Sequence, residues 1–192
     1  MRKLLAMPLV LCVPLAGAAS GAVADEELWH KLATERDLIV LMRHMNSSGG
    51  NPLQWDPSGG CEGETPLTEK GRAQAKQLGA LFLHRGITPG AVISSPMCRC
   101  RDTARLAFGG ELIVHAALRE ISSADRERTA VFERAALTLL ARHAGGSPVV
   151  FISHRPNIEL LTVELIAEEE LLVARMSRQG AFDVLGKLRI NT

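Results

Sequence analysis

The chain lacks a marked excess of charge of either sign, and it has no run of basic residues. Its 192 residues include 22 Lys and Arg against 21 Asp and Glu. Proteins whose main partner is nucleic acid or an anionic membrane usually carry a basic patch or stripe. We therefore expect no nucleic-acid partner, and any strongly electropositive site must be local.

Metal-binding patterns are also lacking. The chain has four cysteines, and the pair Cys98 and Cys100 has no second ligand pair at a spacing that structural zinc sites use. The H-E-x-x-H pattern of metalloproteases does not occur. We expect no bound metal and no other cofactor.

The one long apolar run lies at the N-terminus, from Leu4 through Ala18. It follows Met1-Arg2-Lys3 and precedes the small-residue triplet Ala22-Val23-Ala24, which is the three-part pattern of a secretory signal peptide. Two prolines interrupt the run, and it is short for a membrane span. We expect residues 1–24 to be cleaved, leaving residues 25–192 as one periplasmic domain without a stable membrane anchor. An uncleaved anchor is the alternative.

The remaining chain alternates short apolar runs with amphipathic stretches, and a segment of loop composition occupies residues 47–66. This alternation predicts an α/β fold, a three-layer α/β/α sandwich with a mostly parallel central sheet. The long loop is either functional or an exposed insertion. Strands are expected at 38–42, 91–94, 112–114 and 149–153, helices at 25–35, 68–85, 95–109 (with Pro96 in its first turn), 125–144 and 157–167, and a late antiparallel hairpin at 171–173 and 182–190.

One disulfide is expected, because export would place the mature chain in an oxidising compartment. Cys12 would leave with the signal peptide. Cys98 and Cys100 are too close in sequence to pair comfortably with each other. We predict a bridge from Cys61 to one of these two, preferably Cys98, which leaves one free thiol.

Polar side chains follow three of the predicted strands. Arg43 and His44 follow the first, Arg99 lies near the start of the helix after the second, and His154 ends the strand at 149–153. Ligands bind outside the carboxyl ends of strands in open α/β sheets. Two guanidinium groups, two imidazoles and free helix N–H groups at one edge are suited to a small dianion, above all phosphate.

A histidine in such a cluster can act as a nucleophile toward phosphorus and form a phosphohistidine that water hydrolyses. A phosphomonoester also needs a proton on its leaving oxygen. Glu120 is the best-placed carboxyl group, with Asp125 and Glu127 as substitutes.

At this point the sequence resembles the histidine phosphatase superfamily, which has the phosphoglycerate mutase-like fold. Four ordered blocks carry the resemblance: Leu41-Met42-Arg43-His44, Leu67 through Ala75, Ser94 through Arg99 with Asp102-Thr103-Ala104, and Phe151 through His154 with Asn157-Ile158. The resemblance implies that His44 is the nucleophile, that Arg43, Arg99 and His154 hold the phosphoryl group, and that Glu120 is the proton donor. Small exported bacterial members are the most similar group, and these include lipopolysaccharide core heptose phosphatases.

Two positions depart from the family pattern. Met45 stands where Gly or Ala is usual, and it could crowd the phosphate or only reshape the pocket mouth. Arg155 stands where Gly is frequent, and it could contact substrate or point to solvent. Asn46 and Arg155 are the candidate substrate-binding residues.

The leading hypothesis is a periplasmic, metal-independent phosphatase that acts through a phosphohistidine. Its partner would be a small phosphorylated substrate or a phosphorylated envelope glycan. The alternative, motivated by Met45, is a catalytically weak or inactive module that retains the anion pocket. A phosphosugar mutase is disfavoured, because cytosolic phosphoglycerates are not expected outside the cytoplasm.

Overall fold

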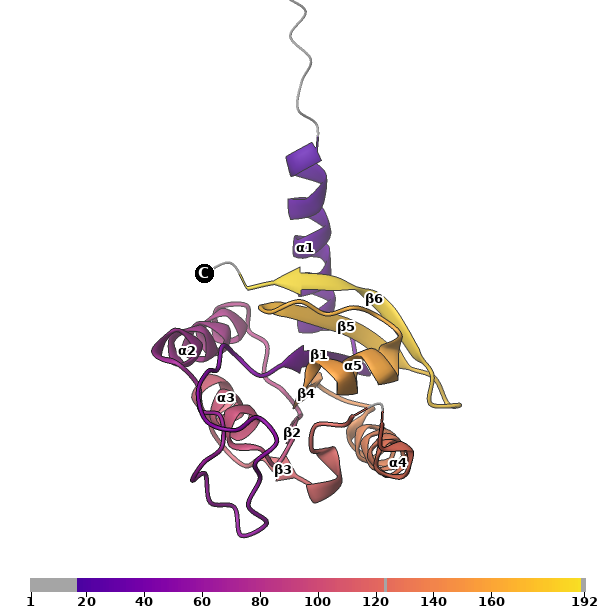
Figure 1. Cartoon of the computed structure of the whole chain (residues 1–192). Coiled ribbons are helices and arrows are strands. Elements are labelled where there is room, and N and C mark those ends of the chain that lie inside the picture. The colour runs from indigo at the N-terminus through magenta and orange to yellow at the C-terminus, as the bar shows by residue number, and fades with distance from the viewer. Residues whose placement is uncertain (1–16, 123, 191–192) are drawn as a thin grey trace, which may run out of the picture.

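A computed structural model of the protein describes residues 17–122 and 124–190. One sheet of six strands has helices on both faces (Figure 1), which confirms the predicted α/β/α sandwich. In chain order the elements are α1 (Gly17–Thr34), β1 (Leu38–Arg43), α2 (Glu69–His84), β2 (Ala91–Ser94), α3 (Cys98–Phe108), β3 (Ile113–Val114), the 3-10 turn η1 (Ala116–Leu118), α4 (Arg126–His143), β4 (Val149–Ser153), α5 (Arg155–Thr162), β5 (Glu170–Met176) and β6 (Phe182–Arg189).

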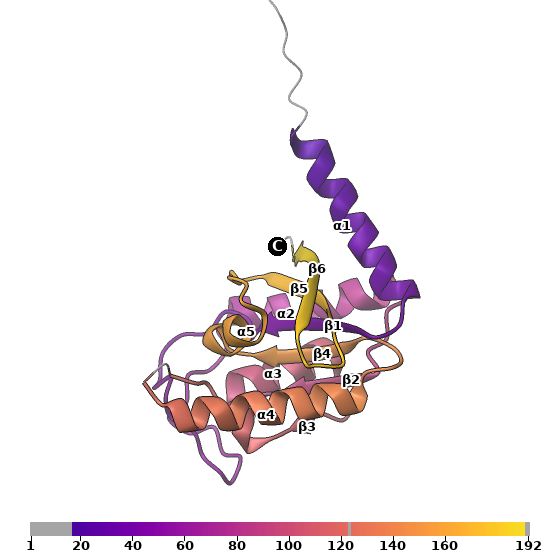
Figure 2. The ribbon, with the colours of Figure 1, turned by 90° about the vertical axis from the view of Figure 1, so that its right-hand side faces the viewer.

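The strand order is β3-β2-β4-β1-β5-β6. The first four strands in this order pair in parallel, and the β5–β6 hairpin adds two antiparallel pairings at one side. The predicted mostly parallel sheet and the late hairpin are both confirmed. Because Arg43 pairs with Ser153, and Ser94 with Ile152, the carboxyl ends of β1, β4 and β2 lie at one edge. Figure 2 shows that the 47–66 loop and the start of α4 lie at this same end of the molecule.

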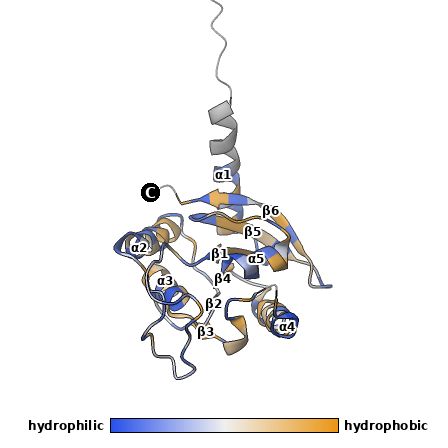
Figure 3. Ribbon diagram, viewed as in Figure 1, coloured by the Kyte–Doolittle hydropathy of each residue, from blue (hydrophilic) through white to orange (hydrophobic). Residues whose placement is uncertain are grey.

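Two apolar layers hold the central strand in place. Val40 and Met42 face a buried cluster formed with α1, α2 and α3, whereas Ile39 and Leu41 face a second cluster formed with α4 and α5. Hydrophobic and hydrophilic residues alternate around α2, α3 and α4 (Figure 3), as expected for helices that cover a sheet on one side. The side chains of β1 from Leu38 to Met42 are at most 1% exposed, so the residues that follow this strand start from a fixed position.

The first helix differs from its prediction. α1 begins at Gly17 rather than at residue 25, and it runs through the expected cleavage triplet Ala22-Val23-Ala24. Alanine has the highest helix propensity, and four of the residues at 18–24 are alanine. The apolar run of the predicted signal peptide lies mostly in residues 1–16, outside the described residues, so its cleavage stays a prediction. No helix in the described part of the chain is long and apolar enough to cross a membrane.

The helix after β2 begins later than predicted. α3 starts at Cys98, and Pro96 precedes its first turn instead of lying within it. The N–H of Ser95 donates to the carbonyl of Ile152 at 2.9 Å, so Ser95 still belongs to the sheet.

The helix after β4 is shorter than the predicted 157–167 segment. α5 covers Arg155–Thr162 and places Pro156 in its first turn, where the missing N–H has no cost. Val163 ends it in the left-handed region with φ 59°, and the N–H of Val163 donates to the carbonyl of Glu159. The other predicted helices and strands are found, with ends that shift by a few residues, and η1 was not predicted.

Candidate active site

His44 follows β1 directly, and the surrounding hydrogen bonds fix its tautomer. Its main-chain N–H donates to the carbonyl of Ser153 at 3.0 Å, and ring Nδ1 lies 2.9 Å from the carbonyl of Met45. A carbonyl oxygen can only accept, so Nδ1 carries the proton and Nε2 keeps its lone pair. Burial, aided by the positive charges of Arg99 and Arg43, lowers the pKa of His44 to about 4. The imidazole is therefore neutral near pH 7.

Arg99 is the second residue of α3, and its side chain is 2% exposed. Nε donates to Nε2 of His44 at 3.2 Å, and Nη2 donates to Oε2 of Glu120 at 2.6 Å. Its third nitrogen, Nη1, is buried and has no hydrogen-bond partner among the described residues. Nε of Arg43 is also buried and has no hydrogen-bond partner among the described residues. The positive charge of Arg43 lowers the pKa of both histidines. Two guanidinium groups thus leave buried donors unused around one imidazole.

His154 is fully buried at the end of β4, and its ring centroid lies 5.5 Å from that of His44. Nη2 of Arg99 lies 3.3 Å from Nδ1, and Oγ of Ser95 lies 2.8 Å from Nε2. Burial, together with the positive charge of Arg99, lowers the pKa of His154 well below its ordinary value.

Glu120 completes the cluster from the segment between η1 and α4. Its Oε2 accepts from Arg99 and lies 3.6 Å from Nδ1 of His154. Its main-chain carbonyl accepts from Nη2 of Arg128 on α4 at 2.7 Å. The structure therefore brings the five predicted catalytic residues, His44, Arg43, Arg99, Glu120 and His154, into one neighbourhood.

Asn157 holds the backbone on both sides of Glu120. Nδ2 of this buried α5 residue donates to the carbonyl of Arg119 at 2.9 Å, and Oδ1 accepts from the N–H of Ile121 at 3.1 Å. We did not predict this role, although Asn157 belongs to the fourth sequence block. Its position three residues after His154 was the available signal.

The two predicted substrate-binding residues have other partners. Oδ1 of Asn46 accepts from Oγ1 of Thr68 at 2.7 Å, which joins the end of β1 to the N-cap of α2. The same approach requires glycine at position 71, because a Cβ there would lie 2.0 Å from the carbonyl oxygen of Asn46. Arg155 is exposed and pairs with Glu159 at 2.7 Å. Neither is hydrogen-bonded to the cluster, and their contact with substrate stays a prediction.

Met45 packs into the core. It is 3% exposed and belongs to the apolar cluster beneath α2 and α3. Its N–H donates to Oγ1 of Thr103 at 3.0 Å. Of the two effects considered for Met45, crowding of the phosphate is not supported by this position.

The 47–66 loop is tied to the start of α3. The predicted disulfide joins Cys61 to Cys98, and Cys100 is the free, buried cysteine. Oε2 of Glu64 accepts from the N–H of Cys98 at 2.7 Å, and the carbonyl of Pro52 accepts from Nη2 of Arg99 at 3.2 Å. The loop thus contacts the cluster directly, which favours a functional segment over an unrelated insertion.

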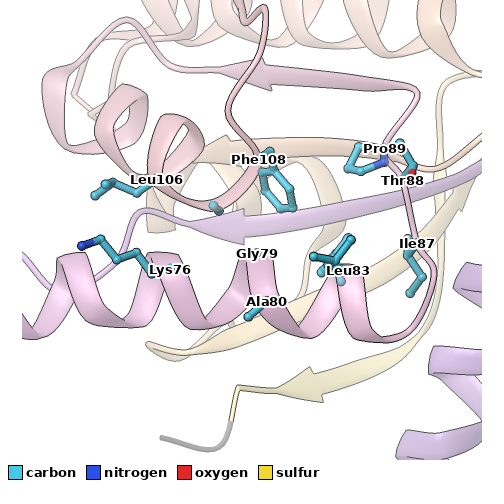
Figure 4. Close-up of a pocket in the computed structure, with 11 residues that line it drawn as sticks. Lys76, Gly79, Ala80, Leu83, Ile87, Thr88, Pro89, Leu106 and Phe108 are labelled. Atoms are coloured by element: carbon cyan, nitrogen blue, oxygen red, sulfur yellow. The ribbon is translucent and has the colours of Figure 1, made fainter.

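A separate hollow of about 400 Å³ lies between the C-terminal halves of α2 and α3 (Figure 4). Its lining is mostly apolar and includes Leu83, Ile87, Leu106 and Phe108. Residues 87–89 precede β2, so this hollow lies toward the opposite edge of the sheet from His44. It contains none of the predicted site residues.

Comparisons with known proteins show the family and the fold of the chain. The sequence pattern of the histidine phosphatase superfamily (branch 1) matches residues 39–136, about half of the chain. The fold is similar to the protein histidine phosphatase SixA complexed with tungstate, with 14% identity, a TM-score of 0.57 and coverage of 79% of this chain and 96% of that one.

Two further solved structures have the same fold. One is a mycobacterial glucosyl-3-phosphoglycerate phosphatase in complex with VO3, with 17% identity, a TM-score of 0.56 and coverage of 77% and 97%. The other is a phosphoserine phosphatase variant from Entamoeba histolytica in complex with phosphoserine, with 15% identity, a TM-score of 0.57 and coverage of 78% and 95%. No curated protein sequence matches the chain significantly. On the family match, the chain belongs to the histidine phosphatase superfamily and is a phosphoric monoester hydrolase.

Proposed function

We propose that the protein is a periplasmic phosphatase that hydrolyses a phosphomonoester through a phosphohistidine on His44, without a metal ion. One observation carries the proposal. Nε2 of the neutral His44 accepts from Nε of Arg99, and two other buried guanidinium donors, Nη1 of Arg99 and Nε of Arg43, have no hydrogen-bond partner among the described residues. A nucleophile and an oxyanion site therefore coincide.

In the first step Nε2 of His44 attacks phosphorus, and the bond from phosphorus to the leaving oxygen breaks. Glu120 gives its proton to that oxygen, so the alcohol leaves neutral. In the second step water attacks phosphorus, the N–P bond breaks, and Glu120 accepts the proton of the water. The hydrogen bond from Nδ1 to the carbonyl of Met45 keeps the ring oriented through both steps.

The arginines supply the positive charge that the phosphoryl group requires. A buried donor without a partner costs roughly 1 to 3 kcal/mol. Oxygens of a bound phosphoryl group could remove this cost at Nη1 of Arg99 and Nε of Arg43. Arginine also binds such oxygens in a bidentate manner.

Glu120 must be protonated before it can act as an acid. Without substrate its carboxylate is paired with Arg99. A phosphate dianion would compete for Arg99, and its negative charge beside Glu120 would favour the neutral carboxylic acid. Substrate binding would thus break the ion pair between Glu120 and Arg99 and favour the protonated form of Glu120, which is the form that can donate a proton.

The alternative is a weak or inactive module with the same anion pocket. Met45 was the reason to consider it, and the burial of Met45 in the core weakens that reason. The proposed substrates remain a small phosphomonoester or a phosphorylated envelope glycan.

Hydrolysis of 4-nitrophenyl phosphate in the presence of EDTA separates the two functions. We expect phosphate release by the purified protein, and none above background by His44→Ala. If the wild-type protein binds phosphate but does not hydrolyse the substrate, the protein is the inactive anion-binding module instead.

The proposed compartment rests on the N-terminal pattern at residues 1–24 and receives support from the Cys61–Cys98 disulfide. Protein recovered from the periplasm should begin at Asp25. An intact Met1 on exported protein, or a purely cytosolic location, would contradict this part of the proposal.

A further inference from the structure

We propose that Trp55, Arg119 and the pocket beside them form a subsite for the leaving group, and that this subsite binds a polyhydroxylated sugar ring. The inference rests on the proposed function, because it assigns the leaving group to the Glu120 side of the site. It adds a substrate class, a phosphorylated sugar, and two residues that select it.

The pocket adjoins the proposed acid through the backbone. It has a volume of about 420 Å³ and is lined by Arg119, by Arg128, by Asp125 and Glu127, and by the small side chains Ala116, Ala117 and Val131. Arg119 precedes Glu120 in sequence, and Arg128 donates to the carbonyl of Glu120. The proton donor must lie next to the leaving oxygen, so the rest of the leaving group extends along this segment.

Trp55 brings the 47–66 loop to the same place. The guanidinium carbon of Arg119 lies 4.1 Å from the centroid of the Trp55 ring. The carbonyl of Pro52, three residues earlier, contacts Arg99, and three residues span at most about 10 Å. Trp55 therefore lies within about 10 Å of a residue that contacts Arg99. Its contact with Arg119 joins the loop to the segment that carries Glu120.

Arg119 is held in place without an ion-pair partner. Among the described residues neither Arg119 nor Arg128 forms a salt bridge, and Nε of Arg119 is buried without a hydrogen-bond partner. The nearby charge of Arg128, added to burial, lowers the pKa of Arg119. A donor-rich pair remains available to a ligand.

The charges of the lining select among ligand classes. Two guanidinium groups that only donate share the lining with two carboxylates that only accept, so the lining as a whole is electrically balanced. A second phosphate would be attracted by the first pair and repelled by the second. Adjacent hydroxyl groups both donate and accept, so they match both pairs. The small apolar side chains of the lining, and the Trp55 ring that lies against Arg119 beside it, suit the C–H faces of a sugar ring.

Binding tests this subsite without requiring turnover. Trp29 lies in the core and Trp55 at the proposed subsite, so Trp55 is the reporter in a Trp29→Phe variant that also carries His44→Ala. We would titrate it with a panel of hexose and pentose monophosphates, ethyl phosphate, phosphoserine and fructose 1,6-bisphosphate. We expect at least one sugar monophosphate to change the fluorescence of Trp55 and to bind about tenfold more tightly than ethyl phosphate, the gain expected from one charged hydrogen bond.

Arg119→Ala should remove most of that preference and leave ethyl phosphate binding within about twofold, whereas Arg126→Ala, an exposed arginine at the start of α4, should preserve the preference. In the protein with an intact His44, kcat/KM should show the same preference for the sugar monophosphate over ethyl phosphate. If every sugar monophosphate binds like ethyl phosphate, or if phosphoserine or the bisphosphate is preferred, the sugar subsite is wrong. Sugar phosphate binding without any hydrolysis would uphold the subsite and contradict the phosphatase mechanism instead.

Discussion

The side chain of Asn157 forms hydrogen bonds with the main chain on both sides of Glu120, with the carbonyl of Arg119 and the N–H of Ile121. Arg128 holds the carbonyl of Glu120 itself. Three hydrogen bonds from two helices thus fix the backbone of a residue whose carboxylate is itself part of the reaction centre. The carboxyl group of Glu120 lies on a loop, but these hydrogen bonds to α4 and α5 hold its backbone in a fixed position.

Asn157→Ala should slow the hydrolysis of an alkyl phosphate more than that of 4-nitrophenyl phosphate. The substitution leaves two buried backbone groups without partners, which destabilises the fold by roughly 2 to 4 kcal/mol, and it frees Glu120 to move. Nitrophenolate needs little protonation, so its release depends less on the acid. The measurement is kcat/KM for both substrates, with the free energy of unfolding from urea titration.

Ile158→Val is the matched control, because it removes buried volume from the same turn of α5 and no hydrogen bond to the segment around Glu120. It should lower stability by about 1 kcal/mol and change both rates alike. Equal losses for the two substrates in Asn157→Ala would show that Asn157 supports only the fold.

Glu120→Gln keeps the shape of the side chain but cannot supply a proton. It also replaces the charge that pairs with Arg99. We expect kcat on an alkyl phosphate to fall by about 100-fold or more, the usual contribution of a general acid, and kcat on 4-nitrophenyl phosphate to fall much less. A uniform decrease across leaving groups would assign Glu120 to positioning, and Asp125 or Glu127 would then be tested as the acid.

The stability of the fold should decrease as the pH falls from about 6.5 to about 4, partly because of His44. In this window the unfolded chain binds a proton at His44, whereas the folded chain, with a His44 pKa of about 4, does not. Stability therefore rises with pH across the window. The contribution of His44 is at most about 3 kcal/mol.

The difference between pH 7 and pH 4.5 should be smaller in His44→Asn than in the wild type, as measured by urea unfolding. His30→Asn, which changes an exposed histidine of α1, should retain the wild-type difference. An unchanged pH dependence in His44→Asn would contradict this prediction, because it would mean that folding does not lower the pKa of His44.

Loss of the Cys61–Cys98 bridge should lower both stability and activity. The bridge closes a segment with a sequence separation of 37, for which chain entropy predicts roughly 3 to 4 kcal/mol. The neighbouring contacts at Cys98 and Arg99 position the loop and the phosphate-binding helix. We expect Cys61→Ser to reduce unfolding free energy by up to this amount and to raise KM for 4-nitrophenyl phosphate, whereas Cys100→Ser keeps the bridge. Three free thiols in the exported protein, counted after unfolding without a reductant, would exclude the bridge.

The sequence predicts the site centre well, because its residues directly follow apolar strands. β1 and β4 are short runs buried on both faces, and His44 and His154 come immediately after them. Counting and spacing also predicted a bridge from Cys61 to Cys98 or Cys100, with Cys98 preferred, and the structure has Cys61–Cys98. These features depend on local patterns and on the rule that parallel strands share a carboxyl edge.

Contacts between distant segments were not predictable in the same way. The bonds of Asn157 reach residues 36 and 38 positions away, and no local periodicity encodes them. The start of α3 was misplaced because the hydrogen bond from Ser95 to Ile152 extends the sheet by one residue. The pair between Arg155 and Glu159 on α5 was also not predicted, and a contact between Arg155 and substrate stays a prediction.

The most direct test of the account is to trap the covalent intermediate. Wild-type protein mixed with a ³²P-labelled phosphomonoester and quenched within milliseconds should carry label that is lost in acid and retained in base, as expected for a phosphoramidate. Peptide mapping under basic conditions should locate the label on His44, and His44→Ala should carry none. A wild-type protein that is active but never labelled at His44, or a His44→Ala variant that retains full activity, would contradict the assignment of this strand end as the catalytic centre.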